Sequence, residues 1–178
     1  MPIDEKLPFK SVHIAVLTVS DTRTYDDDKS GQILVDRLIE DGHVLADRAI
    51  VTDDADKIAE QFRRWIERED VDAIVSTGGT GLTGRDVTPE AMMKVCEKDI
   101  PGFGEYFRWI SAKKIGTSTI QSRAMAGLAK GTYLFALPGS SGACKDGWDE
   151  ILHFQLDFRH RPCNFVELMP RLREHETS

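Results

Sequence analysis

The chain has few cysteines, and no two of them stand close together. Its 178 residues include three, Cys96, Cys144 and Cys163, and there is no CxxC motif. An odd number of widely spaced cysteines indicates reduced thiols rather than a disulfide framework. We therefore predict a cytoplasmic protein whose cysteines are structural.

Long apolar runs and an excess of basic residues are also missing. No run approaches the roughly 18 apolar residues of a membrane span, and residues 1–6 lack the apolar core of a signal peptide. The 30 acidic residues outnumber the 23 lysines and arginines, which gives a net charge of −7. We therefore expect neither a membrane nor a nucleic acid as a partner. An anionic ligand must be held locally, by backbone amides and a few cationic side chains.

Two common catalytic patterns are absent as well. The five histidines show neither HExxH nor paired spacing, so a structural zinc site is not predicted. The stretch Gly139-Ser140-Ser141-Gly142 lacks the GxSxG spacing of a hydrolase elbow. Cys144 lies near a possible helix N-terminus, a position that lowers the pKa of a thiol. Without a histidine partner visible in the sequence, it is a poor candidate for a nucleophile.

What the chain does contain is an alternation of apolar strands and amphipathic helices. Four runs predict strands, at residues 12–19, 44–51, 71–75 and 132–137. Between them, apolar residues recur at helical spacing, as in Ile58, Phe62 and Trp65. Residues 120–128 are predicted as a short helix or an irregular segment. This alternation predicts a single three-layer α/β domain with a largely parallel sheet.

The most informative stretch is the glycine-rich segment 76–90, which follows the third predicted strand. Four glycines in seven positions let the backbone turn sharply and approach a ligand closely. Thr88 then stands at an expected N-cap, and Pro89 at the first position of a helix that runs through Cys96. A strand, a glycine loop and a capped helix together can hold phosphate or another oxyanion on backbone amides. A tight turn with a purely structural role is the alternative.

Two well-known nucleotide motifs fit this segment only in part. Residues 79–84 match GxGxxG, but that fingerprint belongs to the first βα turn and should lead to a second strand ending in an acidic residue. Here the next helix leads to Asp99-Ile100-Pro101-Gly102, which cannot form a buried parallel strand. The same residues fit GxxxxG, but Arg85-Asp86 stands where a P-loop needs Lys and then Ser or Thr. A phosphate site of another kind is favoured.

Polar residues follow all four predicted strands, and the carboxyl ends of parallel strands share one edge of a sheet. We predict that a ligand is bound there by Ser20, Asp21, Thr77, Gly78, Gly79, Thr80, Gly81, Pro138, Gly139 and Ser140. Asp53 and Asp86 are expected at the same edge. These carboxylates would repel a bound phosphate, so we predict that they hold Mg²⁺, which prefers one or two carboxylates together with phosphate oxygens.

Several motifs, in a fixed order, resemble the MoaB/MogA molybdopterin-binding family. They are Thr18-Val19-Ser20-Asp21, Asp28-Lys29-Ser30-Gly31, residues 77–81, residues 85–90, residues 101–105, Ser122-Arg123 and residues 137–140. Residues 115–124 and 161–165 are similar to one branch of the family. The resemblance implies a three-layer αβα sandwich with a mixed, mostly parallel sheet. It divides the chain into an N-terminal extension (1–11), a single molybdopterin-binding domain (12–168) and a C-terminal tail (169–178).

The resemblance also implies an activity. The family transfers an adenylyl group from ATP to the terminal phosphate of molybdopterin, with Mg²⁺ and release of pyrophosphate. Asp86 and Asp53 match two aspartates that the family uses, and Ser122 matches a serine on the pterin side. A homotrimer or homohexamer is implied, with Phe107 and Trp109 as buried contacts. The alternatives are a non-catalytic molybdopterin-binding or carrier protein of the same fold, and a nucleotide-binding oligomer unrelated to molybdenum.

Overall fold

The sheet has six strands and is mostly parallel. The computed structural model describes residues 2–176. The strands are β1 (His13–Val19), β2 (Val44–Val51), β3 (Ala73–Thr77), β4 (Lys98–Asp99), β5 (Met125–Ala129) and β6 (Thr132–Leu137). They lie in the order β2-β1-β3-β6-β5-β4. The first four in that order run parallel to one another, whereas β5 and β4 are antiparallel to their neighbours. The predicted mixed, mostly parallel sheet is confirmed.

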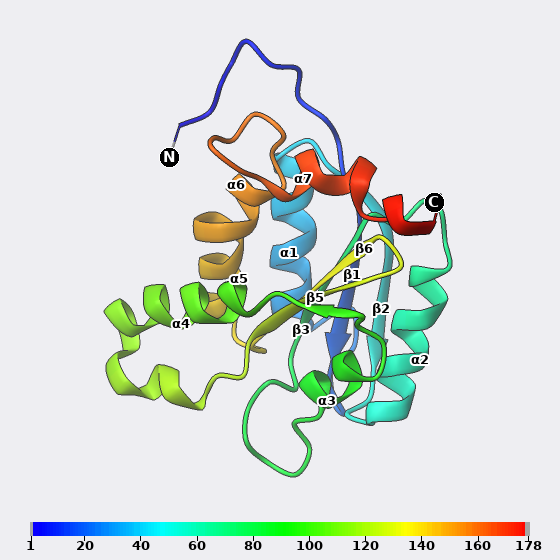
Figure 1. Cartoon of the computed structure of the whole chain (residues 1–178). Helices are drawn as coiled ribbons and strands as arrows, with labels where there is room; N and C mark the ends of the chain where they lie inside the picture. Colours follow the sequence, from blue (N-terminus) through cyan, green and yellow to red (C-terminus); the bar gives the residue numbers. More distant parts are fainter. Residues whose placement is uncertain (1, 177–178) are drawn as a thin grey trace.

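Helices cover both faces of this sheet. They are α1 (Lys29–Glu40), α2 (Ala55–Ile66), α3 (Thr88–Met93), α4 (Pro101–Ile115), α5 (Ser141–Gly147), α6 (His153–Gln155) and α7 (Phe165–Leu168), with tighter or wider turns at η1 (Gly116–Gln121), η2 (Trp148–Leu152), η3 (Met169–Arg171) and η4 (Glu174–Glu176). Helices α1, α4, α5 and η2 pack on one face, and α2 and α3 pack on the other (Figure 1). The predicted three-layer sandwich is therefore confirmed. Among the described residues, none of these helices has the length and apolar character needed to cross a membrane.

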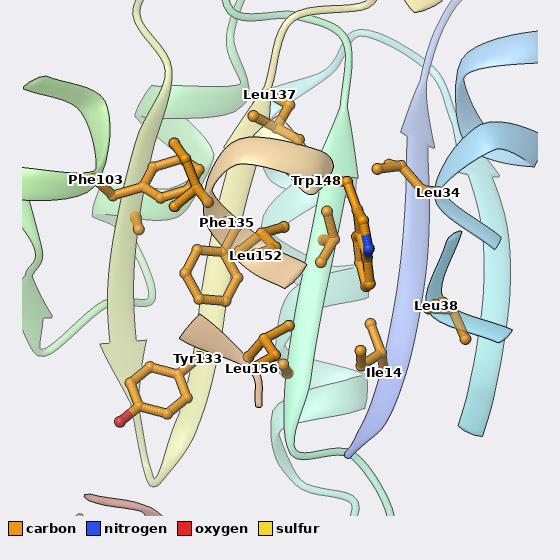
Figure 2. Packing of buried hydrophobic residues seen from close by; sticks show 14 of the residues in the cluster. Ile14, Leu34, Leu38, Phe103, Tyr133, Phe135, Leu137, Trp148, Leu152 and Leu156 are labelled. Atoms are coloured by element: carbon orange, nitrogen blue, oxygen red, sulfur yellow. The ribbon is translucent and has the colours of Figure 1, made fainter. Parts of the chain in front are cut away.

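The alternation of side chains along the central strands creates two cores. Ile14 on β1 and Phe135 on β6 face α1 and η2, where Trp148 is fully buried (Figure 2). The intervening residues, such as Leu17 and Leu134, face α2 and α3. Because both faces of these strands bury apolar side chains, each strand appears in the sequence as a nearly continuous apolar run.

One stretch folds differently from the expectation. Residues 120–128, predicted as a short helix or an irregular segment, form the end of η1 and most of β5. The sequence Met-Ala-Gly-Leu-Ala of β5 lacks the β-branched and aromatic residues that signal a strand. It pairs with β6 through a two-residue turn in which Lys130 and Gly131 both have positive φ (48° and 83°), as a type I′ hairpin requires. The prediction fails because pairing with β6 determines this strand, whereas its own composition does not.

The helix after the glycine loop is shorter than predicted. It ends at Met93, three residues before Cys96. The chain then forms β4, a two-residue strand that pairs antiparallel with β5 at the edge of the sheet. Both residues of β4 are exposed. The expectation that no buried parallel strand follows this helix is confirmed.

The two ends of the described chain lie against the body of the domain. Ile3 forms an antiparallel bridge with His160, and the Asp4 amide donates to the Arg159 carbonyl oxygen at 2.9 Å. The Phe9 ring lies 5.3 Å from the His43 ring. In the predicted C-terminal tail, residues 169–176 contain η3 and η4. Residue 1 of the predicted extension and residues 177–178 of the tail lie outside the described residues.

The layered core predicts different costs for two neighbouring positions on α1. Leu38 is fully buried against the sheet, whereas Ile39 is 56% exposed. We expect Leu38→Ala to lower the free energy of unfolding by about 2–5 kcal/mol, because packed methyl groups are lost and a cavity remains. Ile39→Ala, the matched control, should change it by about 0.5 kcal/mol or less. Urea denaturation measures both values, and equal losses in the two variants would contradict this arrangement.

Candidate functional site

A cavity of about 720 Å³ opens at the carboxyl ends of the parallel strands. This volume suits a small organic ligand. The predicted residues that line it are Ser20, Asp53, Thr77, Gly78, Gly79, Thr80, Gly81, Asp86, Ser122, Pro138, Gly139 and Ser140. The fold therefore gathers nearly all of the predicted site residues around one hollow. Which of them contact a ligand stays a prediction.

The glycine turn after β3 keeps its shape through close backbone contacts. Gly78 and Gly79 have φ values of 100° and 68°, in the region that favours glycine. A Cβ on Gly78 would overlap the Val19 carbonyl oxygen, and a Cβ on Gly79 would overlap the Thr88 hydroxyl. Turns of this kind gather backbone amides into a concave surface that suits an anion.

Thr88 has a different role from the predicted one. The N-cap residue of helix α3 is Val87, whose side chain forms no capping hydrogen bond. The Thr88 hydroxyl donates to the Gly78 carbonyl oxygen at 2.8 Å, and the Thr88 amide donates to the Gly79 carbonyl oxygen at 3.0 Å. The N-cap prediction is wrong, because this threonine ties α3 to the glycine turn.

Asp86 is anchored within the glycine loop. Its Oδ2 accepts hydrogen bonds from the Thr83 amide at 2.9 Å and the Thr83 hydroxyl at 2.7 Å. Burial acts to raise the pKa of Asp86, but these bonds and the Gly81 amide outweigh it and hold the pKa below its ordinary value. The Asp86 carboxylate is therefore ionised at neutral pH where it borders the cavity.

Asp53 has the opposite electrostatic environment. Partial burial raises the pKa of Asp53, and the negative charges of Asp21 and Asp86 raise it further. The Asp21 amide, which hydrogen-bonds to the Asp53 carboxylate, and the positive charge of Arg85 offset only part of this rise, and the Asp53 amide in turn donates to Asp21 at 3.1 Å. A carboxylate in this situation is one that a nearby cation would stabilise.

Asp21 lies beside the cavity and does not belong to its lining. Its carboxylate accepts hydrogen bonds from Arg85, at 2.9 Å from Nε and 2.7 Å from Nη2. Together with the bond from the Asp53 amide, this pair joins the loops that follow β1, β2 and β3. The geometry therefore favours a positioning role for Asp21 over direct ligand binding.

Arg123, absent from the predicted site residues, clamps the glycine loop. Its Nε donates to the Gly81 carbonyl oxygen at 2.8 Å, and its Nη2 donates to the Asp86 carbonyl oxygen at 2.7 Å. Its Nη1 forms an ion pair with Glu90. A planar guanidinium suits several acceptors at once. The motif Ser122-Arg123 contains this residue, but a single sequence does not show where the arginine side chain points.

A second wall of the cavity comes from α4 and η1, which the sequence did not place at the site. Its residues from these elements are Phe107, Ser111, Lys114, Ile115, Ser118, Thr119 and Gln121. Lys114 forms an ion pair with Asp146 of α5, which also lines the cavity. Predicting this wall would require knowing how α4 packs across the sheet.

Cys144 does not have the lowered pKa that its position suggested. Burial raises the pKa of its thiol to about 11. Its Sγ lies 3.1 Å from the Thr77 hydroxyl oxygen, behind the strand end. The expectation of a lowered pKa is wrong, because loss of solvent outweighs any effect of the helix terminus.

The fold is that of the α/β class, whose ligands bind at the carboxyl ends of parallel strands, where this chain has its cavity. A more specific assignment comes from sequence. Residues 15–157 match the model of a family described as "Probable molybdopterin binding domain". The chain belongs to this molybdopterin-binding family, as its motifs predicted.

Individual relatives agree with the family assignment. Molybdenum cofactor biosynthesis protein B of Escherichia coli strain K12 is 48% identical over 157 residues, which are 88% of this chain and 92% of the relative. A crystal structure of a molybdenum cofactor biosynthesis protein B superimposes with a TM-score of 0.83 at 38% identity, covering 93% and 98% of the two chains. The tungsten cofactor synthesizing protein MoaB from Pyrococcus furiosus gives a TM-score of 0.72 at 35% identity, covering 80% and 91%.

The two aspartates should have opposite effects on stability. The raised pKa of Asp53 means that its ionisation costs stability as pH rises through the folded-state value, so Asp53→Asn should raise the melting temperature at pH 7. The lowered pKa of Asp86 means that its ionised form contributes stability, which is lost as pH falls through the folded-state value. Asp86→Asn should therefore lower the melting temperature at pH 7.

Thermal unfolding from about pH 3 to pH 8 measures both effects. The Asp53→Asn difference should vanish toward the acid end, where that carboxyl group is protonated in the folded and unfolded states. The Asp86→Asn difference should shrink only as pH falls below the ordinary aspartate value toward the lowered folded-state pKa. Shifts of the same sign at pH 7 would show that the two environments are not distinct.

Proposed function

We propose that this chain is a Mg²⁺-dependent molybdopterin adenylyltransferase that acts in molybdenum cofactor biosynthesis. The family and the names of the relatives support the pathway and a pterin ligand. The observation that carries the reaction is that Asp53, Asp86 and the glycine turn line one cavity. The three cysteines are free, which agrees with the cytoplasmic location that we propose.

The cavity fits a magnesium ion whose coordination is completed by substrate oxygens. Within residues 2–176, no group of three or more His, Cys, Asp or Glu side chains is placed to hold a metal by itself. Two carboxylates, Asp53 and Asp86, border the cavity, and their mutual repulsion contributes to the raised pKa of Asp53. Mg²⁺ is commonly bound by one or two carboxylates together with phosphate oxygens and water. When bound, it neutralises phosphate charge.

The proposed reaction is a displacement at phosphorus. An oxygen of the molybdopterin phosphate bonds to the α-phosphorus of ATP, the bond to the bridging oxygen breaks, and pyrophosphate leaves. A phosphate nucleophile is already ionised at neutral pH, so no side chain has to remove a proton. The chain contributes positioning and electrostatics. In this scheme the glycine turn offers amides to phosphate, and Arg123 fixes the loop that carries Asp86.

One observation favours the alternative of a non-catalytic pterin-binding or carrier protein. The Asp86 Oδ2 already accepts two hydrogen bonds from Thr83, so this carboxylate has a structural role in the loop. A protein that only binds pterin could keep Asp86 for that role alone. The pKa of Asp53 is raised, so its ionised form does not stabilise a loop in this way, and it is therefore the sharper probe of catalysis.

Purified protein with molybdopterin, ATP and Mg²⁺ should form adenylylated pterin and release pyrophosphate, and a chelator should stop the reaction. Asp53→Asn should lower the rate by at least about a hundredfold, the scale of a lost transition-state electrostatic contact, and pterin binding should persist. Asp86→Asn should also abolish turnover while binding persists. Asp99→Asn, on the exposed edge strand β4, is the control.

Two results would count against the enzyme, and one would count against the proposed role of Asp53. Pterin binding without ATP consumption would establish the carrier. Full activity of Asp53→Asn would remove the metal role of that residue. Failure to bind pterin at all, with nucleotide binding intact, would point to a nucleotide-binding oligomer unrelated to molybdenum.

We also propose a homotrimer or homohexamer, with contacts through α4 and η1. Large apolar side chains stand exposed there, including Trp109 (56%) and Ile120 (76%). The Trp109 ring is covered on one side by the Lys113 ammonium group, 3.6 Å from the ring centroid. Phe107, expected beside Trp109 as a contact between subunits, is 1% exposed and packs in the chain's own core.

Light scattering after size exclusion should give a mass of three or six chains. Trp109→Glu should shift the population to smaller species, because a charge cannot be buried unpaired in an interface. Leu168→Glu, at a similarly exposed apolar residue on α7, is the matched control and should leave the mass unchanged. A monomeric wild-type protein would contradict the assembly, and an unchanged mass for Trp109→Glu would move the interface elsewhere.

A further inference from the structure

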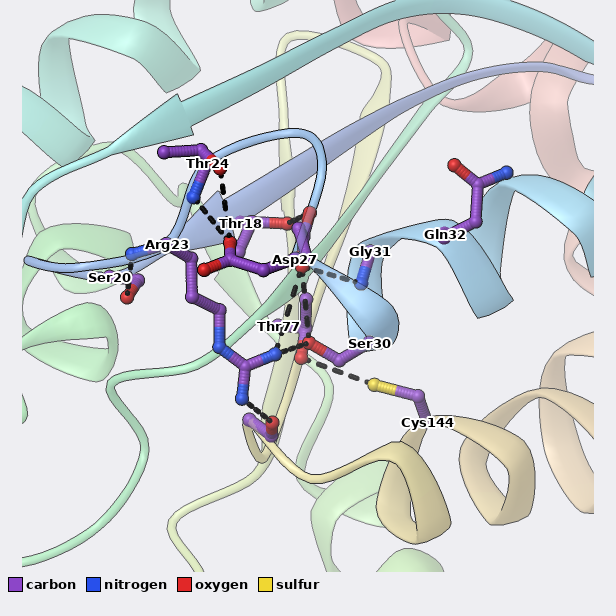
Figure 3. Close-up of polar contacts among 12 residues, drawn as sticks. Thr18, Ser20, Arg23, Thr24, Asp27, Ser30, Gly31, Gln32, Thr77 and Cys144 are labelled. Carbon is purple, nitrogen blue, oxygen red and sulfur yellow. Dashed lines mark hydrogen bonds and ion pairs between the residues drawn. The ribbon is translucent and has the colours of Figure 1, made fainter.

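Arg23 occupies part of the cavity wall and has no role in the function proposed above. It lies in the loop between β1 and α1, and its side chain lines the cavity. Its Nη1 donates to the Ser30 hydroxyl at 3.2 Å and its Nη2 donates to the Gly139 carbonyl oxygen at 3.4 Å (Figure 3). Both bonds are long for a charged donor, and 36% of the side chain is exposed. The guanidinium can therefore donate further hydrogen bonds.

The buried carboxylate nearest to Arg23 is balanced by another arginine. Asp28 has a fully buried side chain that accepts hydrogen bonds from the Thr18 hydroxyl at 2.6 Å and the Gly31 amide at 3.0 Å. Arg48 Nη2 lies 3.1 Å from its Oδ2, whereas Arg23 Nη1 lies 3.9 Å from its Oδ1. Asp28 therefore pairs closely with Arg48 and more distantly with Arg23, and this group of two arginines and one carboxylate carries one excess positive charge.

The carboxylates that line the cavity form no ion pair with Arg23 among the described residues. In the part of the chain that the structure describes, one other lysine or arginine lines the cavity, Lys114, and it is paired with Asp146. Neither Asp53 nor Asp86 forms an ion pair with Arg23 among these residues. The cavity is therefore lined by the glycine turn and by one cation, Arg23, whose ion pair with Asp28 is long at 3.9 Å.

Gly139 connects this cation to the glycine turn. The two backbones are so close that a Cβ on Gly139 would lie 3.3 Å from the Gly78 Cα. The Arg23 Nη2 contacts the carbonyl oxygen of this same Gly139. The guanidinium and the glycine turn therefore both lie against Gly139 and line the same part of the cavity.

We propose that Arg23 binds a phosphate group of the ligand through its planar fork and holds that group against the Gly78–Gly79 turn. An arginine fork matches phosphate oxygens in geometry and charge, which a lysine matches only in charge. A pterin phosphate and a nucleotide phosphate share this chemistry. The identity of the ligand rests on the proposed function, but the anion site itself does not.

The test compares Arg23→Gln, which removes the charge, with Arg23→Lys, which keeps the charge but not the fork. Arg64→Gln is the matched control, because Arg64 is 66% exposed on α2 and pairs only with Glu60. Calorimetric titration with pyrophosphate, without Mg²⁺, probes the anion site on the intact chain. Separate titrations with ATP–Mg²⁺ and with molybdopterin identify the source of the phosphate.

Arg23→Gln should weaken pyrophosphate binding by about tenfold to a hundredfold, the scale of a lost charge-assisted hydrogen bond. Arg23→Lys should weaken it by about threefold or more, because the bidentate contact is lost. Arg64→Gln should stay within about twofold of the wild-type protein. A parallel loss for molybdopterin alone assigns a pterin phosphate, and a loss for ATP alone assigns a nucleotide phosphate.

The proposal is overturned if folded Arg23→Gln, verified by its melting curve, binds pyrophosphate as the wild-type protein does. It is also overturned if the wild-type protein binds no pyrophosphate. If Arg23→Gln does not fold, Arg23→Lys decides, and wild-type affinity in that variant contradicts the role of the fork. If Arg23→Gln weakens pyrophosphate binding but the wild-type protein forms no adenylylated pterin, the proposed function is rejected and the anion site is retained.

Discussion

The close approach of three backbones at the carboxyl ends of β1, β3 and β6 is the constraint on which the site depends. Gly78 leaves no room for a Cβ beside the Val19 carbonyl oxygen, and Gly139 packs directly on Gly78. The loops after these strands can therefore meet over the sheet edge, and the cavity forms between them and α4. Thr88 from α3 and Arg123 from the segment before β5 then fix the glycine loop by hydrogen bonds. The backbone that meets a ligand is thus positioned before the ligand arrives.

Asp53 and Asp86 both carry a negative charge, but they affect the stability of the fold in opposite directions. Asp86 shapes its own loop through Thr83, and its ionised form stabilises the fold. Burial and neighbouring carboxylates outweigh the favourable contacts of Asp53, and its ionised form is a cost to the fold. An unfavourable charge held beside a cavity is a common mark of a functional site. Arg23 also lines this cavity, which therefore carries a cation as well as these two carboxylates.

The apolar pattern of the sequence predicts the central strands and the helices that cover them. Strands β1, β3 and β6 are mostly apolar and buried, so their sequences identify them. The strand ends followed by Ser20, Asp53 and Ser140 then follow from the topology. Strand β5 was missed because its small residues are specified by pairing with β6. The N-cap prediction for Thr88 failed because its hydroxyl donates to the carbonyl oxygen of Gly78, ten positions earlier, instead of capping α3. The contribution of α4 to the cavity was missed for the same kind of reason, since tertiary packing alone brings Lys114 there.

The pairing of Ile3 with His160 has a consequence for how the molecule can be handled. The first described residues and the last described helix both lie at the end of the sheet opposite the glycine loop (Figure 1). A tether attached at either end of the chain would therefore leave the cavity mouth pointing into solution. On a sensor chip, where the ligand arrives from solution, either attachment would keep the cavity accessible.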